Sequence, residues 1–360
     1  MLSLSQMTEM MTLDDTLALL QDLIRIPSLS REEAACADSL EQYLQARGQT
    51  VNRCGNNLWC QAPGYDSSRP TLLLNSHIDT VTPASSWKRQ PFEPSVEDGR
   101  LYGLGSNDAG ASVCCLVQTF LHLSQKPQSY NLVLGLSCEE EITGTGGIER
   151  LMQALPPIDL AIVGEPTGMR AAVAEKGLMV LDCTAHGQAG HAAHNTGDNA
   201  IYKAMKDIAW FQHTRLPRVS DLLGPVKMTV TVIQAGTRHN IIPDTCTFTV
   251  DVRVNELYRN EELCEYIKTQ VDCEVKARSY RLSSSGIDLG HPVVERCRQL
   301  GLECYGSPTL SDQARMSCPS LKIGPGDSLR SHTADEYICL DELSRGLQLY
   351  ASLLDGLKLK

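Results

Sequence analysis

Helical repeats and short apolar runs alternate along the first part of the chain. Apolar residues recur at helical spacing over 13–26, and Ser30 with Glu33 predicts a capping box that opens a second helix ending near Arg47. A third helix, of small and apolar residues, is predicted over 111–123. The apolar runs predict buried strands at 69–75, 131–137 and 159–163. This alternation indicates an α/β domain with a mixed, mainly parallel sheet.

A different pattern begins after Gly177. Strands and helices there follow the order βαββαβ, which is typical of a ferredoxin-like α+β unit of about one hundred residues. The predicted elements lie at 178–185, 198–211, 227–234, 245–254, 261–271 and 273–280. Because the α/β pattern resumes at His291, this unit is predicted to be inserted into the first domain. The expected domains are therefore 1–176 with 283–360, and 177–282 as the insertion.

Composition excludes several classes of function. Of the 360 residues, 42% are hydrophobic and 21% are charged, and the formal net charge of −11 argues against a general nucleic-acid surface. No apolar run approaches the roughly 18 residues that span a membrane, and residues 1–12 lack the features of a secretory signal. The fourteen cysteines are irregularly spaced and form no C-x-x-C pair, which indicates reduced thiols. A cytoplasmic location is predicted.

Metal-capable side chains stand where the predicted strands end. They are His77, Glu139 with Glu140, and Glu165, together with Asp108 before a helix and His332 after the last strand. Because ligands bind at the carboxyl ends of the strands in open α/β sheets, these groups are expected to converge. Taken singly, Asp108 reads as a helix cap, the glutamates as a solvated charge run and His332 as a surface loop residue. Their repeated placement at strand ends favours a metal site.

The types of these residues suggest the chemistry. Carboxylates with a few imidazoles and no thiolate suit zinc in an open catalytic site, or two metals that share a carboxylate. Two metals can hold a water and polarise a carbonyl, and a further carboxylate can carry the water's proton to a leaving nitrogen. Adjacent glutamates supply both needs, because one can bind metal while its neighbour acts as the base.

A series of motifs occurs in order over nearly the whole chain. They are Ser76-His77-Ile78-Asp79-Thr80-Val81, Trp87 with Pro91-Phe92, Gly99-Arg100-Leu101-Tyr102-Gly103, Gly105-Ser106-Asn107-Asp108, Glu139-Glu140, Gly164-Glu165-Pro166-Thr167 and Ser331-His332-Thr333. Together they resemble the M20 family of metallopeptidases and deacylases, and within it the group of acetylornithine deacetylase and succinyl-diaminopimelate desuccinylase. The resemblance implies a zinc-peptidase-like catalytic domain with an inserted lid and dimerisation domain.

The resemblance also implies a two-metal centre. Asp108 would bridge two zinc ions, with cobalt able to replace zinc. His77 and Glu165 would complete the coordination of one ion, and Glu140 and His332 that of the other. One departure concerns the bridging residue, because the family usually has a lysine near it where this chain reads Asp108-Ala109-Gly110.

Further roles come from the same resemblance. Asp79 would hold His77 in place, and Glu139 would act as general base and then as general acid. The peptide bond between Asp108 and Ala109 would be cis. The segment 311–314 lies where the family varies with substrate, and the sequence assigns no role to Gln313 within it.

The inserted domain resembles the family's lid and dimerisation domain, so a homodimer is expected. The segment that contains His191 resembles the one whose histidine reaches the active site of the partner subunit, where it would stabilise the oxyanion. His186 and His194 are rivals for this role. Asn240 and Arg253 are candidates for substrate binding, since the planar fork of an arginine suits a carboxylate. The alternative for Arg253 is an ordinary ion pair on its strand.

The predicted function is metal-dependent removal of a small acyl group from an N-acyl amino acid. N-acetylornithine deacetylation in arginine biosynthesis is the specific expectation. The alternatives are an N-succinyl amino acid desuccinylase, an acyl-citrulline deacylase, or a dipeptidase or carboxypeptidase. A non-enzymatic binding homologue would have lost a ligand or the base, whereas all the predicted metal ligands and Glu139 are present. No nucleic acid or membrane is predicted as a partner.

Overall fold

The computed structural model describes residues 12–194 and 196–359, which form two compact units. The first unit comprises the chain up to Val173, together with Gly286–Tyr305 and the segment from Ser311 onward. The second unit comprises Ala174–Ser285 and Gly306–Leu310. The insertion thus begins at Ala174 and ends at Ser285, where the sequence suggested 177 and 282, and it also takes in a short later segment.

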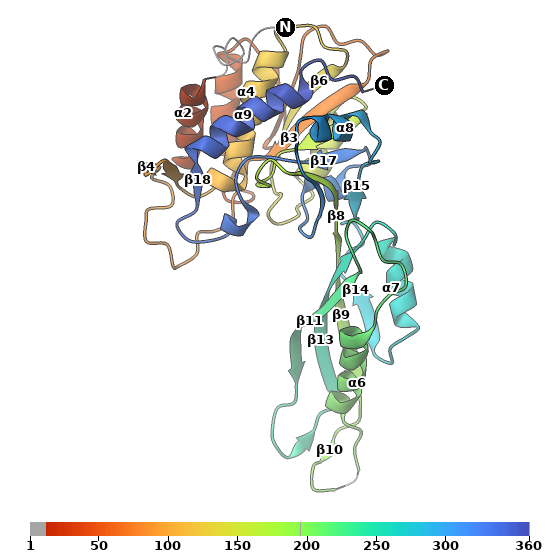
Figure 1. Ribbon diagram of the computed structural model, residues 1–360. Coiled ribbons are helices and arrows are strands. Elements are labelled where there is room, and N and C mark those ends of the chain that lie inside the picture. Colours follow the sequence, from red (N-terminus) through yellow and green to blue (C-terminus); the bar gives the residue numbers. More distant parts are fainter. Residues whose placement is uncertain (1–11, 195, 360) are drawn as a thin grey trace. The chain divides into compact units, whose positions relative to one another are not determined.

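A mixed sheet forms the centre of the first unit (Figure 1). Its strands are β1 (Val51–Cys54), β2 (Asn57–Gln61), β6 (Asn131–Ser137), β3 (Thr71–His77), β7 (Leu160–Val163), β17 (Ser320–Lys322), β8 (Ala171–Glu175) and β15 (Ser285–Gly286) in spatial order, with β16 (Cys304–Ser307) beside β8. The four central strands, β6, β3, β7 and β17, run parallel, and antiparallel strands flank them. The predicted mixed, mainly parallel α/β sheet is therefore confirmed.

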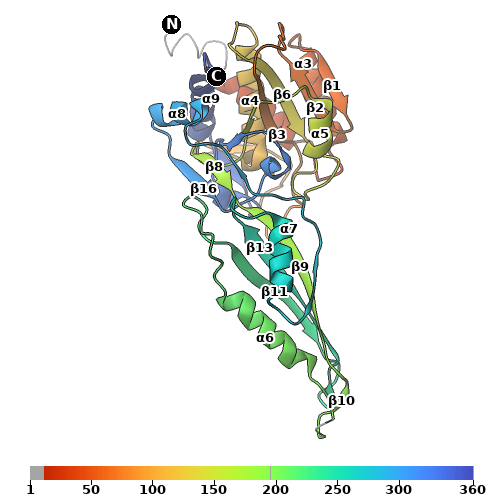
Figure 2. The ribbon, with the colours of Figure 1, turned by 90° about the vertical axis from the view of Figure 1, so that its right-hand side faces the viewer.

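Helices cover both faces of this sheet, which explains the apolar composition of its central strands. Every residue of β3 and β6 is buried. On one face α4 (Ala111–Leu123) packs against these strands, and α2 (Leu13–Ile24) and α9 (Leu340–Leu354) pack on α4 (Figures 1 and 2). On the same face α3 (Ala34–Gln45) packs on β1 and β2, and its Tyr43 hydroxyl accepts a hydrogen bond of 2.7 Å from Gln118 of α4. On the other face lies α5 (Ile148–Ala154), which packs with Leu73 and Val133 of the central strands. Strands buried on both faces need no polar alternation, as the sequence indicated.

Shorter elements complete the first unit. A small antiparallel sheet contains β4 (Ser95–Glu97), β5 (Arg100–Tyr102) and β18 (Tyr337–Cys339). The remaining helical segments are η1 (Ser106–Gly110), α8 (Pro292–Gln299), η2 (Asp312–Arg315) and η3 (Ser328–Arg330). None of the helices in the described part of the chain is long and apolar enough to cross a membrane. All fourteen cysteines are unpaired.

One predicted local motif is wrong. Helix α3 begins at Ala34, and its N-cap residue Glu33 makes no side-chain capping bond. The Ser30 hydroxyl, which was expected to cap this helix, instead donates a hydrogen bond of 2.6 Å to the Asp79 carboxylate. The Ser30 hydroxyl therefore binds Asp79, which is distant in the sequence, and does not cap the helix.

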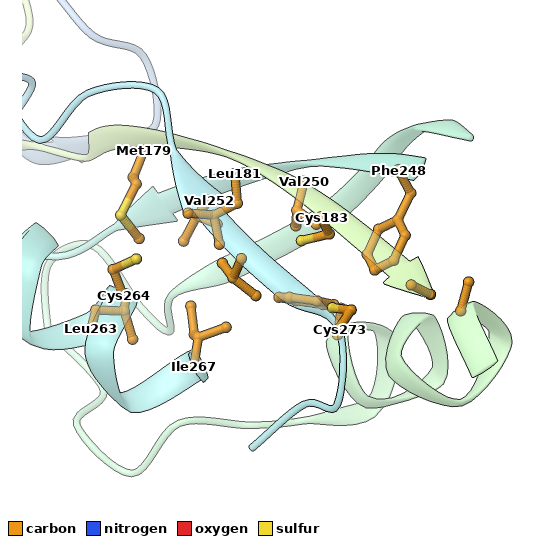
Figure 3. Packing of buried hydrophobic residues seen from close by; sticks show 14 of the residues in the cluster. Met179, Leu181, Cys183, Phe248, Val250, Val252, Leu263, Cys264, Ile267 and Cys273 are labelled. Carbon is orange, nitrogen blue, oxygen red and sulfur yellow. The ribbon is translucent and has the colours of Figure 1, made fainter. Parts of the chain in front are cut away.

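The second unit has the predicted βαββαβ order. Its elements are β9 (Gly177–His186), α6 (Ala200–His213), β11 (Lys227–Ala235), β13 (Thr245–Val254), α7 (Asn260–Lys268) and β14 (Glu274–Ala277), with the two-residue strands β10 (Gly190–His191) and β12 (Ile241–Ile242) pairing apart from them. The antiparallel sheet has the order β11-β13-β9-β14, which is the ferredoxin-like arrangement. Alternate residues of β9 and β13 point into one core with the apolar sides of α6 and α7 (Figure 3).

We expect the Phe248→Ala substitution to destabilise the second unit by about 3–5 kcal/mol, because it removes a buried ring and leaves a cavity. The Phe248 side chain is 2% exposed and packs edge-on against Phe211. Chemical denaturation followed by circular dichroism measures the change. Val232→Ala is the matched control, since Val232 is 48% exposed and a surface change costs about 0.5 kcal/mol or less. Equal effects of the two substitutions would contradict this description of the core.

Candidate metal centre

The candidate ligands lie at the carboxyl ends of three neighbouring strands of the main sheet. His77 is the last residue of β3, the glutamates 139–141 follow β6, and Glu165 follows β7. β3 lies between β6 and β7 and is parallel to both, so all three carboxyl ends face the same way. The convergence predicted from the strand ends is therefore found in the structure.

A first group consists of His77, Asp108 and Glu165, whose ligand atoms lie within 4.8 Å of one another. The Nε2 atom of His77 is 3.2 Å from Oδ1 of Asp108 and 3.8 Å from Oε1 of Glu165. His77 is 2% exposed. These are the three residues that the resemblance assigns to one ion.

A second group consists of Asp108, Glu141 and His332, and its ligand atoms also lie within 4.8 Å of one another. The Nε2 atom of His332 is 2.8 Å from Oε2 of Glu141 and 3.9 Å from Oδ2 of Asp108. Asp108 thus belongs to both groups and offers a different oxygen to each, as a bridging carboxylate must. The Asp108–Ala109 peptide bond is cis, as the resemblance implies.

The second group contains Glu141, whereas the resemblance implied Glu140 as the ligand beside His332. The backbone of Glu139 has φ of +55°, so the chain turns sharply straight after Cys138. The Glu139 carboxylate is directed into its own loop, where it accepts a hydrogen bond of 3.2 Å from the Gly146 N–H. The contact with Gly146 directs this carboxylate into its own loop, while Glu141 joins His332 in the second group.

The half-buried Glu140 lies close enough to His77 and Glu165 to interact electrostatically with both. Burial raises the pKa of Glu140 well above its usual range; the His77 imidazole opposes this shift, and the Glu165 carboxylate adds to it. Among the described residues, its carboxylate has no hydrogen-bond partner. A carboxyl group with a raised pKa and no partner can exchange a proton with a bound molecule.

Asp79 organises two parts of the centre at once. Its backbone carbonyl accepts a hydrogen bond of 2.9 Å from Nδ1 of His77, and its Oδ1 lies 3.5 Å from the same nitrogen. The carboxylate also accepts the backbone N–H of Glu140 at 3.0 Å and that of Glu141 at 3.2 Å. Asp79 therefore contacts the Nδ1 side of His77 and also holds the loop that carries the glutamates.

The crowding of acidic groups suits a cationic ligand. Burial raises the pKa of Glu165 to about 8, against the opposing effect of His77 and with a further increase from Asp108. The hydrogen bond that the His332 imidazole donates to the Glu141 carboxylate raises the pKa of His332 to about 9. Four carboxylates and two imidazoles thus share a confined site, and their mutual repulsion would be relieved by divalent cations. The donor set is that of zinc and related metals.

Sequence reasoning missed Glu336, which is 2% exposed. Its carboxylate accepts backbone N–H groups of Gly105, Asn107 and Asp108 at 3.0, 2.8 and 2.9 Å. Burial raises its pKa to about 7, and the Asp108 carboxylate adds to this. No sequence pattern marked Glu336, because its partners are backbone groups that any residue supplies.

The other predicted site residues lie in the second unit. His191 is an exposed residue of β10, with the ring of His194 5.4 Å away, and Asn240 is exposed. Arg253 makes two hydrogen bonds to the Asp251 carboxylate, at 2.9 and 3.1 Å. This bidentate contact favours the ion-pair alternative for Arg253.

Comparisons with known proteins agree with this fold. Residues 73–356 match the sequence model of peptidase family M20/M25/M40. Succinyl-diaminopimelate desuccinylase of Delftia acidovorans is 30% identical over 384 residues, covering 95% of this chain and 98% of that protein. The enzyme of the same name from Paracidovorax citrulli is 31% identical over 282 residues, with 71% of each chain covered.

Solved structures show the same fold. A tripeptidase of Staphylococcus aureus superposes with a TM-score of 0.78 at 21% identity, covering 96% of this chain and 98% of that chain. The Bacillus subtilis protein YXEP, described as a dinuclear metal binding peptidase, has a TM-score of 0.71 at 17% identity, covering 95% and 97%. Together the fold and the site define a hydrolase of amide bonds. The chain belongs to peptidase family M20/M25/M40.

The membership of Glu141 in the second ligand group can be tested by substitution. We expect the Glu141→Gln variant to retain about one divalent ion per chain where the unmodified protein retains about two, because a carboxylate ligand of the second group is lost. Elemental analysis after dialysis measures the ion content. Glu139→Gln is the matched control and should keep both ions, since its carboxylate contacts Gly146. Retention of both ions by Glu141→Gln, together with loss of one ion in Glu140→Gln, would instead support Glu140 as the ligand.

Proposed function

We propose that this protein removes a small acyl group from the nitrogen of an amino acid by metal-dependent hydrolysis. The observation that carries the proposal is the pair of ligand groups that share Asp108, with the unpartnered carboxylate of Glu140 close to them. Membership of an amide-hydrolysing family supports the reaction type. A reducing cytoplasmic location is part of the proposal, in keeping with fourteen unpaired thiols.

Zinc is the proposed metal, with cobalt able to replace it. His77 and Glu165 would hold one ion, Glu141 and His332 the other, and Asp108 both. When bound, a pair of such ions polarises an amide carbonyl and lowers the pKa of a water molecule. Asp79 would keep His77 in its binding orientation through the contact at Nδ1.

Glu140 is the proposed general base, in place of Glu139. It would take a proton from the attacking water and then deliver it to the nitrogen that leaves as the amide bond breaks. Its raised pKa makes the Glu140 carboxylate a stronger base than an ordinary glutamate, which favours proton uptake from water. The carboxylate of Glu139, turned toward Gly146, is left with a structural role.

The proposed substrates are small N-acyl amino acids. The relatives named as desuccinylases are 30% and 31% identical and cover 95% and 71% of this chain, which favours an N-succinyl amino acid among the substrates. N-acetylornithine, the specific substrate expected from the sequence, remains a second candidate because it carries the same scissile amide with a shorter acyl group. A difference of this size in a pocket discriminates between substrates by only about 1–3 kcal/mol per methylene unless a polar partner is lost.

A panel of N-acetyl and N-succinyl amino acids tests the function. We expect hydrolysis of at least one member of the panel, and a loss of about 10²–10⁴ in kcat in the Glu140→Gln variant, because proton transfer then lacks its carboxylate. Release of the free amino acid measures the rate.

Two controls sharpen this test. Glu140→Gln should retain the metal content of the unmodified protein, and Glu139→Gln should retain most of its activity. Inactivity of the metal-loaded protein on every member of the panel would overturn the proposed substrate class. Full activity of Glu140→Gln would overturn the assignment of the base.

We further propose a homodimer in which His191 acts in the active site of the partner subunit, as a donor to the oxyanion. The support is the exposed position of His191 and the family resemblance of its segment. Asn240 would contribute to substrate binding from the same unit.

Mixing two inactive variants tests the role of His191 across subunits. His191→Ala chains combined with Glu140→Gln chains should recover about a quarter of the unmodified activity, because each mixed dimer regains one complete site and half of the dimers are mixed. Assay of the refolded mixture against each parent measures the recovery. No recovery in a demonstrated mixed dimer would place the histidine's action within its own chain.

A further inference from the structure

The buried carboxylate of Glu336 holds the loop that carries Asp108. Its Oε1 atom accepts the N–H groups of Asn107 at 2.8 Å and Asp108 at 2.9 Å, and its Oε2 atom accepts that of Gly105 at 3.0 Å. The backbone carbonyl of Glu336 also accepts the Gly103 N–H at 3.1 Å. Because three backbone N–H groups of this loop share one buried carboxylate, the loop has little freedom relative to Glu336.

A second pair of hydrogen bonds joins the same loop to Asp327, which precedes His332 in the sequence. The Asn107 side chain accepts the backbone N–H of Asp327 at 2.9 Å and donates to its carbonyl at 3.1 Å. Asp327 precedes His332 and Glu336 follows it. The segment that carries His332 is therefore fastened to the Asp108 loop at both ends.

Fewer contacts hold the side chain of His332 than hold the loop that carries Asp108. Its side chain is 56% exposed, its φ is +60°, and its ring contacts Glu141 at 2.8 Å. It belongs to no helix or strand. The position of its imidazole relative to Asp108 therefore depends on the two ties made by Glu336 and Asn107.

The first ligand group is held differently. His77 and Glu165 lie at the ends of β3 and β7, which pair directly, and the Gly164 N–H donates to the Asn75 carbonyl at 2.7 Å. The hydrogen bonds of the sheet thus fix the spacing of His77 and Glu165 without help from Glu336. Only the shared ligand, Asp108, reaches this group from the tied loop.

We propose that Glu336 is a positioning residue that sets the spacing of Asp108 and His332, and thereby the cation affinity of the Asp108–Glu141–His332 group. This inference rests on the proposed function, because it takes both groups to be metal sites. Partners that orient metal ligands typically change metal affinity by about 10–100-fold when they are replaced.

Zinc titration of the chelator-stripped full-length protein tests the proposal. Calorimetry of the unmodified protein should resolve two binding steps, and the His332→Ala variant identifies which step belongs to the second group. In Glu336→Gln, we expect that step to weaken by about 10–100-fold and the other step to weaken by clearly less, because only one of its ligands, Asp108, lies on the loop that Glu336 holds. The amide of glutamine keeps the shape of the side chain but presents N–H groups where the loop requires an acceptor.

Two further variants separate positioning from general stability. Glu336→Asp keeps the charge but withdraws the carboxylate by one methylene, and it should show the same selective loss. Asp341→Asn removes an exposed acid in the first turn of α9 and should leave both steps unchanged. Circular dichroism of each metal-free variant verifies the fold, and Glu336→Asp replaces Glu336→Gln in the titration if the latter does not fold.

The outcomes distinguish the inference from the function on which it rests. Two zinc steps in the unmodified protein, both unaltered or both equally weakened in the Glu336 variants, would overturn the positioning role and leave the proposed function standing. A single zinc step in the unmodified protein would overturn both.

Discussion

One carboxylate, that of Asp108, lies between two imidazoles, and the whole centre depends on this placement. Its Oδ1 is 3.2 Å from His77 and its Oδ2 is 3.9 Å from His332, so a single side chain serves both ligand groups. Sheet pairing fixes the strand ends that carry His77 and Glu165. Asp108, by contrast, comes from a loop, and the loop must be held as firmly as the strands are.

Buried acids provide that support by accepting backbone N–H groups. Glu33 and Asp79 together accept three consecutive N–H groups of residues 139–141, and Glu336 accepts three from the loop that ends at Asp108. Each such bond compensates part of the cost of burying a charge. At the centre itself, burial raises the pKa of Glu165 and the Asp108 carboxylate adds to this, so the crowded acidic groups suit cations.

The periodic elements show how far local patterns reach. Helix α4 and the strands β6 and β13 have the predicted bounds, because each is long enough for its burial pattern to be read from the apolar residues alone. The sequence patterns did not predict β8 or β16, and the capping box at Ser30 failed because Asp79 binds that hydroxyl. Short strands and single polar side chains are decided by partners that lie far away in the sequence.

The sequence by itself determined the class of fold, the family and the segments that meet at the centre, because hydrophobic periodicity and strand ends are local properties. It also placed His77, Asp108, Glu165 and His332 among the converging groups. Only the tertiary structure decided which of three consecutive glutamates joins His332, since the turn at Glu139 sets the directions of the Glu140 and Glu141 side chains. The role of Glu336 likewise arises from folding, because its partners are backbone groups more than two hundred residues earlier.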